Sequence, residues 1–318
     1  MAGHTTFKLG GPADCFAEPE TGSELVFLLE VAYRDAIPVS IVGGGSNLLV
    51  SDLGIRGIVI SLARFGRIER LDGRDAFASP GCLKSASATD SGEPILVKSG
   101  AGASMEALVE WCADRGIAGL ERFAGLPGSV GGAAFMNARC YERSVSDAFF
   151  RAEVLYFRAG RCTIEEKGFD PAEWDYKRSP FQDRNGSDPS RIGERAAIVL
   201  SVTFSLAPGD PGWIRAEMDK YVKDREEKGH FRFPSAGSMF KNNHAFGKPS
   251  GKIIDEAGLR GFRIGGAEVA PWHGNLVINS GNATAGEVKT LVDEVRARVA
   301  AKTGFELEPE VIMAGDWR

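Results

Sequence analysis

The sequence VSIVGGGSNLLV, residues 39–50, places three successive glycines between two short apolar runs. Short apolar runs bounded by glycine are typical of buried strands. A loop without Cβ atoms lets successive backbone N–H groups approach an anion such as phosphate closely. The stretch therefore predicts a buried strand, an anion-binding loop and a second strand.

Two further glycine clusters follow in the first half of the chain. Gly100 to Gly102 follow the strand-like run ILVK, 95–98, and a third cluster covers 125–132 within GLERFAGLPGSVGGAAFMNA, 119–138. One glycine-rich loop more often serves a tight turn, whereas three such loops favour a cofactor that contains a diphosphate. Neither G-x-G-x-x-G in a βαβ unit nor G-x-x-x-x-G-K-[ST] occurs, which argues against Rossmann and P-loop sites.

Two helices carry start signals in the sequence. Thr21 and Glu24 have capping-box spacing, apolar residues then recur at helical intervals, and Pro38 closes the segment. Thr284 and Glu287 repeat this spacing before a longer helix. The apolar face of that second helix comprises Val288, Leu291, Val292, Val295 and Val299.

Between these two helices the sequence predicts strands, the start of a second unit and two surface segments. Strand-like runs cover 152–157 and 196–206, and a new unit begins near 209 with a helix whose apolar face includes Ile214 and Met218. Residues 64–94 are polar and weakly patterned, so we expect a surface hairpin there, and 183–194 predict a surface insertion.

The composition is typical of a globular protein, with 43% hydrophobic and 25% charged residues among 318. A net charge of −5 argues against bulk electrostatic binding to nucleic acid or to an acidic membrane surface. The five cysteines form no C-x-x-C pair and the four histidines lack metal-ligand spacing, so we expect no disulfide framework and no metal. No apolar run reaches the length of a membrane span and no export signal begins the chain, which favours the cytoplasm.

Ser238, in PSAGSMFKN at 234–242, allows more than one role. Ser238 and Lys241 match S-x-x-K, while Ser280-Gly281-Asn282 and Lys302-Thr303-Gly304 complete the order of motifs found in penicillin-binding acyl-serine enzymes. In those enzymes K-T-G lies on a strand, whereas Lys302 ends an amphipathic helical pattern here. We therefore keep an acyl-serine enzyme only as an alternative.

Seven strings in order carry a specific resemblance: HTTFKLGGPAD, VGGGSNLLVSD, GLERFAGLPGSVGGAAFMNA, YKRSPF, PSAGSMFKN, IIDEAGLRGFRIGGAEV and LEPEV. From about residue 4 to 313 the chain resembles the UDP-N-acetylenolpyruvoylglucosamine reductases (the MurB family). YKRSPF and the absence of a tyrosine-bearing lid insertion suggest the shorter branch. Arg139 and Cys140 depart from the family pattern, in which small residues are usual there.

The resemblance implies an α+β fold with a two-part FAD-binding domain of the vanillyl-alcohol-oxidase type and a smaller α+β substrate-binding domain. It implies non-covalent FAD and NADPH as co-substrate. The expected divisions are an FAD-binding domain at 1–207, with subdomains of about 1–62 and 63–207, a substrate-binding domain at 208–306, and a tail at 307–318 that returns to the active site.

The implied activity is NADPH-dependent reduction of UDP-N-acetylglucosamine enolpyruvate to UDP-N-acetylmuramate in peptidoglycan precursor synthesis, by a monomer. Arg178, Ser238 and Glu310 fall on the family's catalytic positions: Ser238 would protonate the α carbon, and Arg178 and Glu310 would stabilise the enolate. Cofactor-binding residues would be Val42, Gly43, Gly44, Gly45, Ser46, Asn47, Gly102, Gly125, Pro127, Gly128, Ser129, Gly131, Gly132 and Asn137. Substrate-binding residues would be Arg178, Lys228, Asn242 and His273.

Two alternatives share the nucleotide-binding features. A flavin-dependent oxidase or dehydrogenase on the same fold would act on another substrate, because fold and cofactor do not determine the reaction. A catalytically silent regulator would bind a UDP-sugar and consume no NADPH.

Overall fold

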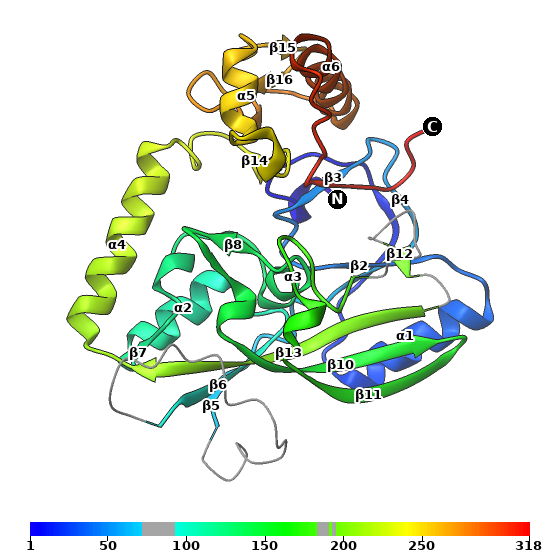
Figure 1. Cartoon of the computed structure of the whole chain (residues 1–318). Coiled ribbons are helices and arrows are strands. Elements are labelled where there is room, and N and C mark those ends of the chain that lie inside the picture. The colour runs from blue at the N-terminus through cyan, green and yellow to red at the C-terminus, as the bar shows by residue number, and fades with distance from the viewer. Residues whose placement is uncertain (72–92, 183–190, 193–194) are drawn as a thin grey trace. The chain divides into compact units, whose positions relative to one another are not determined.

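The computed structural model describes residues 1–71, 93–182, 191–192 and 195–318 (Figure 1). The described residues form two compact units. Unit 1 comprises Met1–Cys15, Gly45–Gly57 and Asp224–Arg318, and unit 2 comprises Phe16–Gly44 and Ile58–Lys223. The domain boundaries expected from the sequence concern functional domains, and they stay predictions.

Helices and strands are interspersed along the chain without a repeating order. The α-helices are α1 (Gly22–Arg34), α2 (Met105–Ala113), α3 (Val130–Phe135), α4 (Pro211–Glu227), α5 (Ser250–Glu256) and α6 (Ala285–Thr303). The strands of the first half are β1 (Ala13–Ala17), β2 (Val39–Val42), β3 (Leu48–Val50), β4 (Ile55–Ser61), β5 (Ile68–Arg70), β6 (Ile95–Gly100), β7 (Ile117–Ala118), β8 (Arg139–Cys140) and β9 (Arg143–Ser144). Those of the second half are β10 (Phe149–Arg158), β11 (Arg161–Gly168), β12 (Arg191–Ile192), β13 (Arg195–Pro208), β14 (Ser235–Ser238), β15 (Arg263–Ile264), β16 (Ala267–Val269), β17 (Leu276–Asn279) and β18 (Ile312–Ala314). This mixture agrees with the predicted α+β class.

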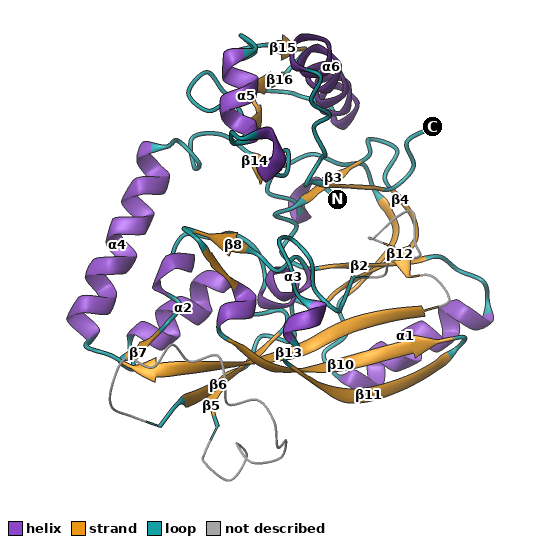
Figure 2. Ribbon diagram, in the orientation of Figure 1, coloured by secondary structure: helices purple, strands orange, loops and turns teal. Residues whose placement is uncertain are grey.

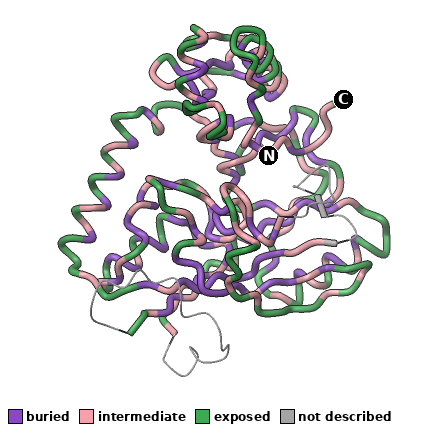
Figure 3. The backbone as a smooth tube through the Cα atoms, viewed as in Figure 1, coloured by how far each residue is buried: buried purple, intermediate pink, exposed green. Residues whose placement is uncertain are grey.

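The main sheet of unit 2 has the strand order β11-β10-β13-β6-β5, and the strands that the sequence predicted at 95–98, 152–157 and 196–206 are β6, β10 and β13. Neighbouring strands run antiparallel, and the long strands β10 and β13 lie side by side (Figure 2). β10 is largely buried, whereas most residues of the edge strand β11 are exposed (Figure 3). The contrast is expected of an edge strand whose outer face meets water.

Helix α1 confirms the first predicted helix. The N–H of Glu24 donates to Oγ1 of Thr21 at 3.2 Å, and Leu25, Leu29 and Ala32 are buried. Strands β2 and β4 then pair in parallel within the sheet whose strand order is β1-β4-β2-β12. Val42, the first of the expected cofactor-binding residues, is the buried last residue of β2.

Unit 1 contains the sheet β14-β17-β16-β15, and α6 contacts β15 and β16 of it. Thr284 and Glu287 form the predicted capping box, since each side chain accepts a hydrogen bond from the other residue's backbone N–H. All five apolar residues predicted for the buried face of α6 are fully buried. The C-terminal strand β18 pairs in parallel with β3, which joins the glycine-loop segment to the end of the chain.

Asp52 joins this segment to α6 as well. Its Oδ1 accepts the N–H of Ala285 at 2.9 Å and its Oδ2 accepts the N–H of Gly286 at 2.8 Å, both in the first turn. We expect Asp52→Ala to lower the free energy of unfolding by about 1–2 kcal/mol, because two helix donors lose a charged acceptor. Chemical denaturation measures the effect. Asp293→Ala, on the exposed face of the same helix, is the control, and an equal loss in both variants would contradict the capping role.

Some expectations concern segments with little described structure. The predicted hairpin at 64–94 lies largely outside the described residues, which include β5 paired with β6. The predicted insertion at 183–194 lies outside them except for 191–192, which form β12. Every helix that the structure describes is too short or too polar to cross a bilayer.

Candidate active site

The first and third glycine clusters pack against each other in unit 2. The N–H of Gly44 donates to Oγ of Ser129 at 3.3 Å, and a Cβ on Gly44 would lie only 2.6 Å from Cα of Gly128. A Cβ on Gly43 would overlap Oγ of Ser129. Glycine is therefore required at 44, where the backbones of the two loops touch, and a Cβ at 43 would displace the hydroxyl of Ser129.

The second cluster joins the same arrangement. The N–H of Gly131 donates to the carbonyl of Ala101 at 2.9 Å, and a Cβ on Gly131 would lie 2.6 Å from Cβ of Ala101. A Cβ on Gly102 would overlap the carbonyl of Leu62. Ser129 caps α3 through Gly132, whose N–H donates to Oγ at 3.3 Å. The three glycine clusters therefore meet around the start of α3.

The loops retain donors that suit a diphosphate. In the described part of the chain, no hydrogen bond uses the N–H groups of Gly128 and Ser129, next to Gly43 and Gly44. In unit 1, the same holds for Gly45, Ser46 and Asn47, which are consecutive. Consecutive free N–H groups form the kind of concavity that binds phosphate oxygens. The residues present thus fit the phosphates of FAD.

Other expected cofactor-binding residues have structural roles of their own. Gly125 and Gly128 adopt positive φ angles of +70° and +113°, and Pro127 between them is exposed. Asn137 is buried, its Oδ1 accepts the N–H of Ser146 at 3.0 Å, and its Nδ2 donates to the carbonyl of Asp175 at 2.9 Å. Their contact with the cofactor stays a prediction.

Arg178 lies in unit 2 at the end of a tight turn. Asp175 and Arg178 exchange backbone hydrogen bonds at 3.0 and 3.2 Å, and Lys177 has a φ of +56°. The turn is held by Nδ2 of Asn137 and by Ser179, whose Oγ donates to the carbonyl of Phe135 at 2.7 Å. Arg178 is half-buried, and its turn is bonded to the segment at the end of α3 through Asp175 and Ser179.

Ser238 and Glu310 are brought together in unit 1. Ser238 ends β14 opposite Leu276 of β17, and the N–H of Glu310 donates to the carbonyl of Met239 at 2.8 Å. Nδ2 of Asn47 donates to the carbonyl of Glu310 at 3.1 Å, so the glycine-loop segment is also held there. Ser238 is half-buried, and in the described structure its Oγ takes part in no hydrogen bond. The convergence of Arg178 with these two residues stays a prediction.

The three expected substrate-binding residues of unit 1, Lys228, Asn242 and His273, differ in their contacts. Oδ1 of Asn242 accepts the N–H of Ser250 at 2.9 Å. Lys228 is exposed and pairs with Asp224 at 2.6 Å. The ring of His273 lies 5.7 Å from that of His230, a residue that sequence reasoning did not select because it belongs to no motif.

Burial disfavours the charged form of both histidines. It lowers the pKa of His230 to about 4, helped by the nearby Arg225, and burial also lowers the pKa of His273. In the unfolded chain a histidine titrates near pH 6.5, so below that pH the unfolded state binds more protons.

The free energy of unfolding should therefore fall as the pH drops from about 6.5 towards 4, and should not depend on this pair above pH 7. We expect His230→Asn to flatten the decline between pH 7 and 5, measured by urea unfolding at each pH. The same change at the exposed His244 should leave the decline intact. A decline of unchanged steepness in His230→Asn would disprove the assignment.

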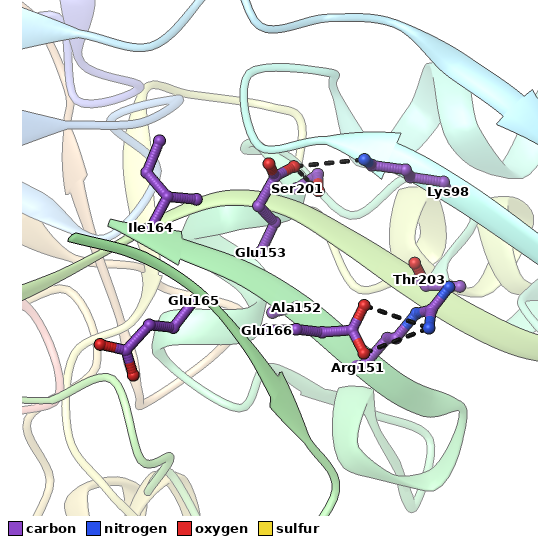
Figure 4. A pocket seen from close by; sticks show the side chains of 9 residues that line it. All are labelled: Lys98, Arg151, Ala152, Glu153, Ile164, Glu165, Glu166, Ser201 and Thr203. Carbon is purple, nitrogen blue, oxygen red and sulfur yellow. Dashed lines mark hydrogen bonds and ion pairs between the residues drawn. The ribbon is translucent and has the colours of Figure 1, made fainter. Parts of the chain in front are cut away.

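A separate pocket of about 260 Å³ lies on the main sheet of unit 2, lined by residues of β6, β10, β11 and β13 (Figure 4). Lys98 pairs with Glu153 at 3.2 Å, and Arg151 with Glu166 at 3.1 Å. The pocket contains none of the predicted site residues. We interpret it as a solvated sheet face with cross-strand ion pairs.

The structure weakens the acyl-serine alternative. Lys302 and Thr303 belong to α6, whereas the K-T-G motif of penicillin-binding enzymes lies on a strand. Among the residues that the structure describes, no three His, Cys, Asp or Glu side chains are placed to hold a metal ion. The departures Arg139 and Cys140 form β8, with Arg139 exposed and Cys140 buried.

Two sequence profiles match separate parts of the chain. One describes an FAD binding domain and covers residues 13–163, and the other describes the C-terminal domain of UDP-N-acetylenolpyruvoylglucosamine reductase and covers residues 229–314. The first contains all three glycine clusters, and the second contains Ser238 and Glu310.

Whole-chain similarity agrees with the profiles. The UDP-N-acetylenolpyruvoylglucosamine reductase of Treponema denticola is 44% identical over 98% of this chain and 91% of its own length. That of Treponema pallidum is 43% identical over 99% of this chain and 92% of its own. The crystal structure of the Thermus caldophilus reductase has a TM-score of 0.70 at 29% identity, covering 98% of this chain and 96% of that one. The chain belongs to the UDP-N-acetylenolpyruvoylglucosamine reductase family.

Proposed function

We propose that the chain reduces UDP-N-acetylglucosamine enolpyruvate to UDP-N-acetylmuramate with FAD as cofactor and NADPH as electron source. As a member of this reductase family with an FAD-binding domain, it is an FAD-dependent oxidoreductase of peptidoglycan precursor synthesis. The observation that carries the proposal is the meeting of three glycine clusters, with unused N–H donors, in the part of the chain that matches an FAD-binding domain.

The loops would hold the cofactor through backbone donors. The N–H groups of Gly45, Ser46 and Asn47, and those of Gly128 and Ser129, would bind phosphate oxygens, with α3 adding the positive end of its dipole. When bound, FAD supplies the hydride that NADPH provides. The remaining residues of the expected set, from Val42 to Asn137, shape these loops or lie beside them.

Arg178 and Glu310 would act on the charge that develops on the substrate. Hydride addition at the β carbon of the enolpyruvyl group leaves an enolate whose charge spreads onto the carboxylate. A guanidinium directed at that carboxylate stabilises the transition state more than the ground state. Glu310 can assist if its carboxyl carries a proton or acts through a hydrogen-bonded water, because a bare carboxylate would repel the enolate.

Ser238 would complete the reaction. Its Oγ–H donates the proton that the α carbon requires, which a hydroxyl can do when the acceptor is a strongly basic carbanion. A half-buried hydroxyl with no partner in the described chain is available for this task. The acyl-serine alternative would need K-T-G on a strand, whereas Lys302 and Thr303 belong to α6.

The substrate would be held by Arg178, Lys228, Asn242 and His273, with the cationic Lys228 suited to the diphosphate. In this proposal residues 1–207 act as the FAD-binding domain, 208–306 as the substrate-binding domain and 307–318 as the tail that carries Glu310. We further propose that the protein works as a monomer in the cytoplasm, where its nucleotide substrates are made.

A direct test uses the purified protein. We expect it to be yellow, or to become so with added FAD, and to oxidise NADPH only when the enolpyruvyl sugar nucleotide is present. Protein that cannot be reconstituted with FAD would overturn the proposal. Binding of UDP-sugar without NADPH oxidation would support the silent regulator instead.

A further inference from the structure

Asn275 is a buried amide one residue before β17, and every hydrogen-bonding group on it is engaged. Its Oδ1 accepts the N–H of Phe240 at 2.9 Å, and its Nδ2 donates to the carbonyl of Phe240 at 2.8 Å. Its backbone carbonyl accepts the N–H of Met239 at 2.9 Å, and its own N–H donates to Nδ1 of His273 at 3.1 Å. Only 4% of the residue is exposed.

The strand ladder explains why an amide is needed here. β14 and β17 pair at Ser235 and Ser238 with a shift in register between them, where Gly237 has a φ of +72°. A bulge of this kind turns the following residues away from regular pairing. The side chain of Asn275 then gives Phe240 one acceptor and one donor, as the peptide of a neighbouring strand would.

On its other side, the segment 239–241 is hydrogen-bonded to residues 308–310, which include Glu310. The carbonyl of Met239 accepts the N–H of Glu310, and the N–H of Lys241 donates to the carbonyl of Glu308 at 2.9 Å. Residues 239–241 therefore lie between Asn275 on one side and 308–310 on the other. One buried amide fixes the backbone that links both proposed catalytic residues of unit 1.

We propose that Asn275 is a positioning residue that sets where Oγ of Ser238 delivers its proton. The inference rests on the proposed function of Ser238. In the step concerned, the O–H bond of Ser238 breaks as a C–H bond forms at the α carbon of the enolate, and the serine oxygen regains a proton from solvent. No electrons are exchanged in this step, so the reduction that precedes it is a separate event.

Misplacement of Oγ has two measurable consequences. Proton transfer slows by about 10–100-fold, because displacing a reacting group by about 1 Å has an effect of that order. Solvent can then protonate the enolate from either face. The α carbon of the product is stereogenic, so a misplaced serine yields a mixture of two configurations where the native enzyme yields one.

The experiment compares Asn275→Asp and Asn275→Ala with Asn279→Ala as matched control. Asn279 ends β17, and its amide also bonds backbone groups, those of Phe7, Gly281 and Ala283, at 3.2 to 3.3 Å. Asn275→Asp has nearly the same shape as asparagine and keeps the acceptor for Phe240 N–H, but it replaces the donor to the Phe240 carbonyl by an oxygen. Thermal unfolding of each variant shows which of them are folded.

Each holoenzyme is reduced anaerobically with NADPH and then mixed with the enolpyruvyl sugar nucleotide, and the configuration of the product at the α carbon is determined. We expect both Asn275 variants to be reduced at the native rate, to be reoxidised 10–100-fold more slowly, and to give mixed configuration. Asn279→Ala should lose thermal stability only.

Three results separate the possibilities. Folded Asn275→Asp with native reoxidation and a single product configuration would overturn the positioning role. Equal slowing of both half-reactions in the Asn275 variants would also overturn it, since that indicates general loosening. If Ser238→Ala in parallel gave native reoxidation, the proposed function of Ser238 would fail first, and the role of Asn275 with it.

Discussion

Replacing Ser238 by alanine should slow the reoxidation of the reduced enzyme by the enolpyruvyl sugar nucleotide by roughly 10²–10⁴-fold, the usual contribution of a general acid. The reduction by NADPH should remain at the native rate, because it transfers no proton to the substrate. Ser238 is half-buried, and its Oγ has no partner within the described chain. The next residue, Met239, accepts the N–H of Glu310 at its carbonyl.

Stopped-flow absorbance of the flavin measures both half-reactions. Ser235→Ala is the matched control, since Ser235 begins the same strand and pairs with Ile278 of β17. We expect this control to retain both rates. Equal loss of both half-reactions in Ser238→Ala would show that the hydroxyl supports the fold or the cofactor, and it would disprove proton donation.

Arg178→Met should also act on the second half-reaction, by roughly 10²–10³-fold, the usual effect of removing one preorganised donor to a developing anion. The flavin should still be reduced by NADPH. Arg178→Lys should restore only part of the rate, because an ammonium group cannot match a carboxylate with two parallel hydrogen bonds.

Lys177→Met controls for the loss of a positive charge in the same turn. Lys177 already has a left-handed φ of +56°, so methionine meets the same backbone constraint there as lysine does. We expect near-native reoxidation in this control. If Lys177→Met and Arg178→Met slowed reoxidation equally, the loss of positive charge in the turn would explain both effects. The specific role of the Arg178 guanidinium would then be wrong.

Local patterns predicted much of the fold because they depend on neighbours in sequence. The capping-box spacings at Thr21 and Thr284 place the starts of α1 and α6 correctly, although the carboxylate of Glu24 accepts the N–H of Glu20 and not that of Thr21. The 3.6-residue period identifies the buried face of α6. The run VSIV became β2, and LLV became β3. Each of these assignments needs only a cap, a period or a short apolar run.

Other features depend on contacts that no local pattern encodes. β3 pairs with β18 from the far end of the chain, and the first glycine loop packs on Ser129. The glycines at 43 and 44 were predicted for the approach of a phosphate. The structure adds a second reason at 44, where a Cβ has no room between the two loops. Sequence alone does not reveal which loops will touch.

For the site, the sequence predicted the proposed catalytic residues but not the residues that position them. The residues Arg178, Ser238 and Glu310 follow from the family strings, but the amides that hold them do not. Asn137 is hydrogen-bonded to the backbone of Asp175, 38 residues away. Asn275 is hydrogen-bonded to the backbone of Phe240, 35 residues away. A buried asparagine in the sequence is the available signal, and only the structure tells which backbone it binds.

A competition between two oxidants for the reduced enzyme tests the proposed reaction. Flavin reduced anaerobically with NADPH is mixed either with the enolpyruvyl sugar nucleotide or with oxygen, and the two rates of reoxidation are compared. We expect much faster reoxidation by the sugar nucleotide, with UDP-N-acetylmuramate as the product. Reoxidation by oxygen at an equal or greater rate, with no such product, would contradict it and indicate an oxidase of another substrate.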